Sequence, residues 1–191
     1  MTKAIQDRRT EQEPAITDRM LGYIEAAMHG FEARGVKWVA KTLTDRGRGS
    51  QESRYGADFA GVLSISLPGY KVNKGFLAQA KMIEPSERLP PGEFGRLQRQ
   101  CEGMLSSSPD SFVFLYSRSG ITIVPALAVL STISRNPHDL YSRSLSRFYE
   151  EHFECFIGDR RLQAPTPEAL ETLRADYQAR KLLYLAAHES R

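Results

Sequence analysis

Three polar residues at the ends of two apolar segments could together bind a hard cation and a phosphate. Asp58 precedes the apolar run 59–67, and Gln79 and Lys81 end the run 75–81. Side chains two positions apart on a strand lie on the same face, so Gln79 and Lys81 would point the same way. Because carboxylate and amide oxygens are hard ligands and a lysine can bind a phosphate, the pattern predicts a site for a divalent cation and a phosphate.

A tight turn between these segments would bring the three residues together. Pro68 and Gly69 favour a turn directly after the run 59–67. Two strands joined in this way form a hairpin or a meander, which places the start of the first strand beside the end of the second. We therefore expect Asp58 to lie beside Gln79 and Lys81.

This arrangement resembles the PD-(D/E)xK nuclease superfamily, which has the restriction-endonuclease-like fold. The family pattern is an Asp at the start of one strand followed by Glu-x-Lys on the next, and the matching positions here are Asp58, Gln79 and Lys81. Gln79 departs from the commonest form, and the resulting Gln-x-Lys resembles that of methylation-dependent restriction enzymes. The resemblance spans about residues 15–130.

The resemblance implies a nuclease that hydrolyses phosphodiester bonds of DNA with Mg²⁺, for which Mn²⁺ can substitute, in restriction, phage defence or DNA repair. Asp58 would anchor the metal, while the Gln79 side chain and the Ala80 carbonyl would add oxygen ligands. Lys81 would steer or deprotonate the attacking water and stabilise the developing charge.

Glutamine in place of glutamate removes a negative charge from the metal site, so a further carboxylate becomes more necessary. Two residues could supply it. Glu25 lies on the predicted first helix, where a glutamate of the family often completes the site. Glu52 lies six positions before Asp58, in the pattern Glu-x-x-x-Gly-Ala-Asp. This pattern looks like a recurrent segment before such a strand, so we favour Glu52 over Glu25.

Basic and amide side chains near these positions could contact the substrate. Arg46, Arg48 and Arg54 belong to a glycine-containing loop that leads to Asp58, and Gln100 lies on the helix predicted after Lys81. Phosphate contacts of this kind position a nucleic acid without reading its sequence. We expect DNA rather than RNA as the partner. Cutting both strands usually needs two sites, which favours a homodimer or larger complex.

The hydrophobic pattern predicts an α/β fold, which the resemblance specifies as a restriction-endonuclease-like mixed central sheet flanked by helices, with a helical C-terminal extension. We expect a flexible arm over 1–14, a nuclease-like domain over 15–163, and a C-terminal helix packed on it over 164–191. The predicted elements are helices from Thr17 or Asp18 to Arg34, 94–105, 125–132, 140–153 and 166–187, and strands 36–43, 59–67, 75–81, 111–117 and 121–125.

Composition is consistent with one domain and excludes several other classes of protein. The chain has 191 residues and a net charge of +3, a mildly basic balance that suits a polyanionic partner without requiring one. No apolar run has transmembrane length and no signal peptide is recognised, so we expect a cytoplasmic protein without membrane association. Neither a phosphate-binding glycine loop nor a histidine pair with metal spacing occurs.

Two other interpretations remain open at this point. The chain could be a nuclease-fold module that has lost activity through Gln79 and serves as a nucleic-acid-binding or protein-interaction subunit. It could also be an unrelated α+β domain in which Gln-x-Lys is a coincidence. Metal-dependent nicking of plasmid DNA separates the first of these interpretations from an active enzyme.

Overall fold

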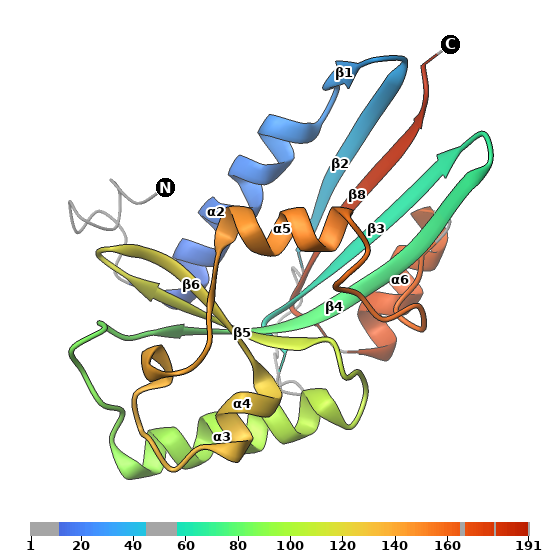
Figure 1. Cartoon of the computed structure of the whole chain (residues 1–191). Coiled ribbons are helices and arrows are strands. Elements are labelled where there is room, and N and C mark those ends of the chain that lie inside the picture. Colours follow the sequence, from blue (N-terminus) through green and yellow to red (C-terminus); the bar gives the residue numbers. More distant parts are fainter. Residues whose placement is uncertain (1–11, 45–56, 165–166, 178, 191) are drawn as a thin grey trace.

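The computed structural model describes residues 12–44, 57–164, 167–177 and 179–190. They form an eight-stranded mixed sheet with helices on both faces (Figure 1). This confirms the predicted α/β class and the mixed central sheet flanked by helices. In sheet order, the strands are β1 (Glu32–Ala33), β2 (Val36–Thr44), β8 (Lys181–Glu189), β3 (Phe59–Leu67), β4 (Tyr70–Met82), β5 (Ser111–Ser117), β6 (Gly120–Pro125) and β7 (Arg143–Ser144).

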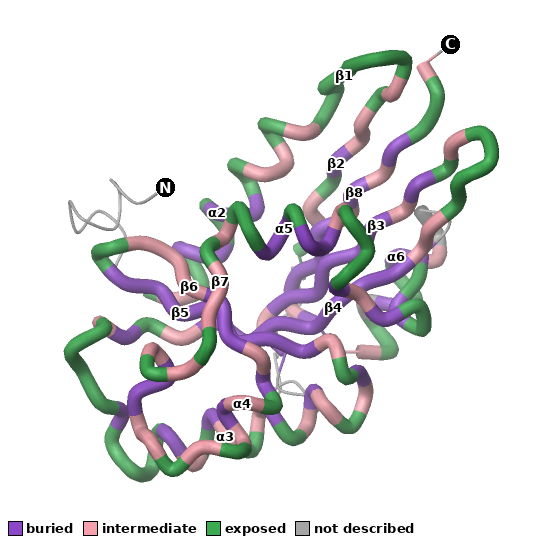
Figure 2. Tube along the Cα trace, in the orientation of Figure 1, coloured by how far each residue is buried: buried purple, intermediate pink, exposed green. Residues whose placement is uncertain are grey.

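The helices cover the two faces of the sheet in separate groups. Residues of two helices pack on one face, namely α2 (Glu13–Met28) and α5 (Leu145–Phe153). Residues of three others pack on the opposite face, namely α3 (Pro91–Leu105), α4 (Ala126–Ser131) and α6 (Pro167–Asp176). Strand β5 is wholly buried between these layers, and β3 and the middle of β4 are mostly buried there, while the turn end of their hairpin is exposed (Figure 2). Among the described residues, no helix combines the length and apolar character needed to cross a membrane.

Successive side chains of a central strand point alternately to the two helical layers. Phe76, Ala78 and Ala80 belong to the core under α2 and α5, while Leu77 belongs to the core under α3. Because side chains alternate along a strand, Gln79 and Lys81 share the face of Leu77. The functional side chains of β4 therefore point toward the layer that contains α3.

The hairpin of β3 and β4 has the register expected from its turn. Pro68 and Gly69 connect the strands, and Gly69 takes the positive φ of 72° that glycine tolerates at such a turn. Phe59 pairs with Ala78, and the Asp58 amide donates to the Ala78 carbonyl at 2.8 Å. This register places Asp58 next to Gln79, as predicted.

The first helix begins and ends earlier than the sequence pattern indicated. It starts at Glu13, with Pro14 in its first turn, and not at Thr17 or Asp18. It ends at Met28 because Gly30 has a φ of 78°, and the chain then forms β1 in the segment that we had assigned to the helix up to Arg34. Of the arm predicted over 1–14, residues 1–11 lie outside the described residues, and the last two are helical.

The predicted C-terminal helix over 164–191 is wrong for its second half. Among the described residues of this segment, the helix covers Pro167–Asp176 alone, and Lys181–Glu189 is a strand between β2 and β3, antiparallel to the first and parallel to the second. Leu183 and Leu185 pack in the core under α2, and Leu182 packs against α6 on the other face. A strand covered on both faces is apolar at successive positions, so its sequence lacks the alternation that identifies a strand.

Candidate active site

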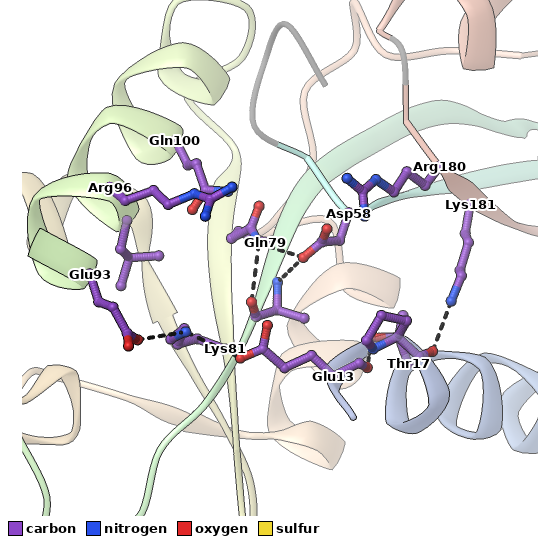
Figure 3. Close-up of a pocket in the computed structure, with 13 residues that line it drawn as sticks. Glu13, Thr17, Asp58, Gln79, Lys81, Glu93, Arg96, Gln100, Arg180 and Lys181 are labelled. Atoms are coloured by element: carbon purple, nitrogen blue, oxygen red, sulfur yellow. Dashed lines mark hydrogen bonds and ion pairs between the residues drawn. The ribbon is translucent and has the colours of Figure 1, made fainter. Parts of the chain in front are cut away.

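A pocket of about 440 Å³ lies where β3 begins, β4 ends and β8 begins (Figure 3). Its lining comes from the first turns of α2, from Asp58, from Gln79 to Lys81, from one side of α3 and from the start of β8. The sequence placed Asp58, Gln79 and Lys81 together, and the structure brings all three to this pocket. Gln100, predicted as a nucleic-acid contact, also lines it from α3.

Three polar groups converge on one point of the pocket. The Asp58 carboxylate oxygen Oδ2 accepts hydrogen bonds from the Ala80 amide at 2.9 Å and from Gln79 Nε2 at 2.5 Å. The same Nε2 donates to the Ala80 carbonyl at 3.1 Å. The Gln79 amide therefore sits between a carboxylate oxygen and a carbonyl oxygen, both of which are hard ligands.

The side-chain oxygen of Gln79, Oε1, indicates that a cation fits between Asp58 Oδ2 and the Ala80 carbonyl. Gln79 is only 6% exposed, and its Oε1 is buried without a hydrogen-bond partner among the described residues. A half-turn of the amide would place Oε1 beside Asp58 Oδ2 and the Ala80 carbonyl. Three oxygens around one point repel each other unless a cation lies between them, so these residues fit the Mg²⁺ site that the sequence predicted.

Few acidic groups support that site. No cluster of three or more His, Cys, Asp or Glu side chains occurs in the part of the chain that the structure describes. Among the described residues that converge here, Asp58 alone would supply negative charge to a cation, and its other ligands would be neutral oxygens. A site of this composition should bind Mg²⁺ or Mn²⁺ more weakly than one with two carboxylates.

Burial raises the pKa of Asp58 above that of an ordinary aspartate. The Ala80 amide and the positive charges of Arg180 and Lys181 oppose this effect, while the negative charge of Glu13 adds to it. Desolvation therefore destabilises the ionised form of the Asp58 carboxyl group. A bound cation would offset this effect, because its positive charge favours the ionised carboxylate.

Lys81 lies between two carboxylates at the edge of the pocket. Its Nζ is 3.1 Å from Glu93 Oε2 and 3.3 Å from Glu13 Oε1. Burial lowers the pKa of Lys81, but the two carboxylates outweigh this and leave the pKa raised. Lys81 is therefore a cation near neutral pH, which favours the predicted role in charge stabilisation over the role of general base.

Glu25, one of the two glutamates predicted to complete the site, does not reach the pocket. Its Oε2 instead accepts a hydrogen bond from the Thr42 amide of β2 at 3.1 Å. The glutamate that α2 contributes to the pocket is Glu13, twelve positions earlier and therefore about 18 Å away along the helix axis. Glu13 was missed because the helix was expected to start after it, although Pro14 was a signal for an earlier start.

The remaining predicted residues cannot be compared with the structure. Glu52 lies outside the described residues, as do the three arginines of the predicted basic loop, Arg46, Arg48 and Arg54. Their proposed roles stay predictions.

Two basic residues of the pocket were missed by sequence reasoning. Arg180 and Lys181 line it from the start of β8. Lys181 Nζ lies 2.7 Å from Asp18 Oδ1 and donates to the Pro14 carbonyl at 2.8 Å, so it fastens the first turns of α2 to the sheet. The signal that was missed is a pair of basic residues directly before an apolar run. The other polar pocket residues, at the ends of the runs 59–67 and 75–78, have the same kind of position.

Comparison of the chain with known protein families, with curated proteins and with solved structures found no match.

Proposed function

We propose that this chain is a metal-dependent nuclease that hydrolyses phosphodiester bonds of DNA and acts in restriction, phage defence or DNA repair. The observation that carries the proposal is the convergence of Asp58 Oδ2, the Ala80 carbonyl and the Gln79 amide beside the cationic Lys81. We further propose a restriction-endonuclease-like core. In its support, α2, β2, β3, β4, α3 and β5 occur along the chain in the order expected for that core, with the short β1 added between α2 and β2.

Asp58, Gln79 and Ala80 would hold Mg²⁺ or Mn²⁺, which supplies a water of lowered pKa and polarises the phosphate. Lys81 is positioned to donate hydrogen bonds to a non-bridging phosphate oxygen and to stabilise the charge that develops there. Glu13 and Glu93 hold Lys81 in place. When Lys81 turns toward a phosphate, one of these carboxylates is free to accept a proton from water.

Incubation of purified protein with supercoiled plasmid tests this function. Nicking that requires Mg²⁺ or Mn²⁺ and stops with a chelator is the expected result. An RNA of the same length tests the preference for DNA. Binding of DNA without cleavage in either metal would instead favour an inactive nuclease-fold module, and neither binding nor cleavage would contradict both functions.

Glu13→Gln is expected to lower the rate of Mn²⁺-dependent cleavage by about 10- to 100-fold, because Glu13 positions Lys81 from outside the metal site. Glu25→Gln is the matched control on the same helix. It should leave the rate unchanged, since Glu25 contacts β2 and not the pocket. Equal losses in the two variants would contradict the assignment of Glu13.

The affinity for Mn²⁺ is expected to fall on acidification at a higher pH than for an ordinary aspartate site. Burial raises the pKa of Asp58, and a proton competes with the metal for its carboxylate. Titration calorimetry between about pH 8 and pH 4, in buffers of different ionisation enthalpy, measures both the affinity and the protons released. An affinity independent of pH across this range would rule out Asp58 as the metal ligand.

A further inference from the structure

Arg180 is the residue directly before β8. Its side chain reaches into the pocket, where the guanidinium points toward Asp58 (Figure 3). Its positive charge acts on the Asp58 carboxylate. Its Nε is buried and has no hydrogen-bond partner among the described residues. A buried donor without a partner is unfavourable, so this guanidinium has unused capacity to bind an acceptor.

Two other basic residues of the pocket already form ion pairs with carboxylates. Lys81 is held by Glu13 and Glu93, and Lys181 by Asp18. Asp58 is the carboxylate that faces Arg180, and it is also the charged ligand of the proposed metal site. A cation bound to Asp58 would take up that negative charge and repel the guanidinium. An anion that contacts both would remove the repulsion.

A phosphate has the chemistry for this position. Guanidinium groups bind phosphate oxygens through two parallel N–H donors, an arrangement that a point charge such as lysine cannot reproduce. We propose that Arg180 binds a non-bridging oxygen of the phosphate that occupies the site formed by Asp58 and Gln79. The inference rests on the proposed nuclease function and adds a substrate contact that belongs to the C-terminal strand.

Arg180→Gln tests this contact, with Arg160→Gln as a matched control. Arg160 is exposed in the segment after α5 and does not line the pocket. Three measurements are made on each protein: Mn²⁺ binding by calorimetry, binding of a fluorescent DNA duplex in Ca²⁺ at several KCl concentrations, and cleavage of that duplex in Mn²⁺.

Arg180→Gln should keep Mn²⁺ binding while the slope of log affinity against log salt falls by about 0.9, the change expected for one lost phosphate contact. Its cleavage rate should fall by about 100-fold or more, because the lost contact is to the reacting phosphate. Arg160→Gln should match the wild type in all three measurements. Wild-type DNA affinity and salt slope in Arg180→Gln would overturn the inference.

Arg180→Lys tests the same contact if Arg180→Gln does not fold. Arg180→Lys keeps the positive charge but not the paired donors, so its cleavage should be about tenfold slower with unchanged Mn²⁺ binding. A wild-type rate in this variant would overturn the inference.

Different results would refute the nuclease function and the phosphate contact of Arg180. A wild-type protein that binds DNA but never cuts it refutes the nuclease, while an altered salt slope in Arg180→Gln would still support the phosphate contact. A wild-type protein that cuts DNA, with an Arg180→Gln variant that cuts it equally well, refutes the contact alone. A wild-type protein that binds no DNA refutes both.

Discussion

Lys81→Ala is expected to reduce Mn²⁺-dependent cleavage of DNA by at least about 100-fold while the protein stays folded. The lysine would donate hydrogen bonds to the reacting phosphate and stabilise the charge that develops on it. Its own contribution to stability is small, because its side chain is 23% exposed and its two ion pairs lie at the rim of the pocket. Single-turnover cleavage and thermal unfolding, measured on the same preparation, test the two halves of this expectation.

Lys71→Ala is the matched control, since Lys71 is an exposed lysine at the other end of β4. It should cut DNA at the wild-type rate. Near-normal cleavage by Lys81→Ala would show that the assigned mechanism is wrong. A large loss of thermal stability in Lys81→Ala would instead give Lys81 a structural role.

Asp58→Asn is expected to abolish detectable Mn²⁺ binding, and with it cleavage, without destabilising the metal-free protein at neutral pH. Burial raises the pKa of Asp58 in the folded state, so the folded state binds its proton more tightly than the unfolded state does. This contribution to stability is fully present below the pKa of the unfolded chain and is lost as the pH rises through the raised pKa. At neutral pH the buried charge is a cost, which asparagine removes.

Thermal unfolding with and without Mn²⁺ separates the two effects of this substitution. The wild type should gain stability with Mn²⁺, because a ligand that binds only the folded state raises the unfolding temperature. Asp58→Asn should not respond to Mn²⁺, and Gln79→Ala should respond weakly, since Gln79 supplies only a neutral oxygen. An equal response in all three proteins would contradict the ligand roles given to Asp58 and Gln79.

The part of the site carried by the hairpin was predictable because a single local feature determines it. The turn at Pro68 and Gly69 fixes the register of β3 against β4, and this register alone places Asp58 beside Gln79. The apolar runs that flank the turn also identify both strands. No knowledge of the rest of the fold was needed, so these residues could be found from spacing and composition.

The part carried by β8 was not predictable for the converse reason. Leu182, Leu183, Leu185 and Ala187 are of types that favour helices, and Leu170, Leu173 and Tyr177 before them have helical spacing. The strand forms because β2 and β3 both pair with it and helices cover both its faces. Tertiary pairing of this kind overrides local preference. Arg180 and Lys181 were missed with the strand.

The central position of β8 has a consequence for how the protein is made. Within the described residues, β8 joins β2 to the block formed by β3 to β7, and its residues are synthesised after those of every other described helix and strand. During translation, β2 and β3 must each leave an edge unpaired until residue 189 has emerged, and exposed edges of this kind invite aggregation. Closure of the sheet and delivery of Arg180 to the pocket then occur in one step, so the pocket lacks part of its lining until β8 has paired.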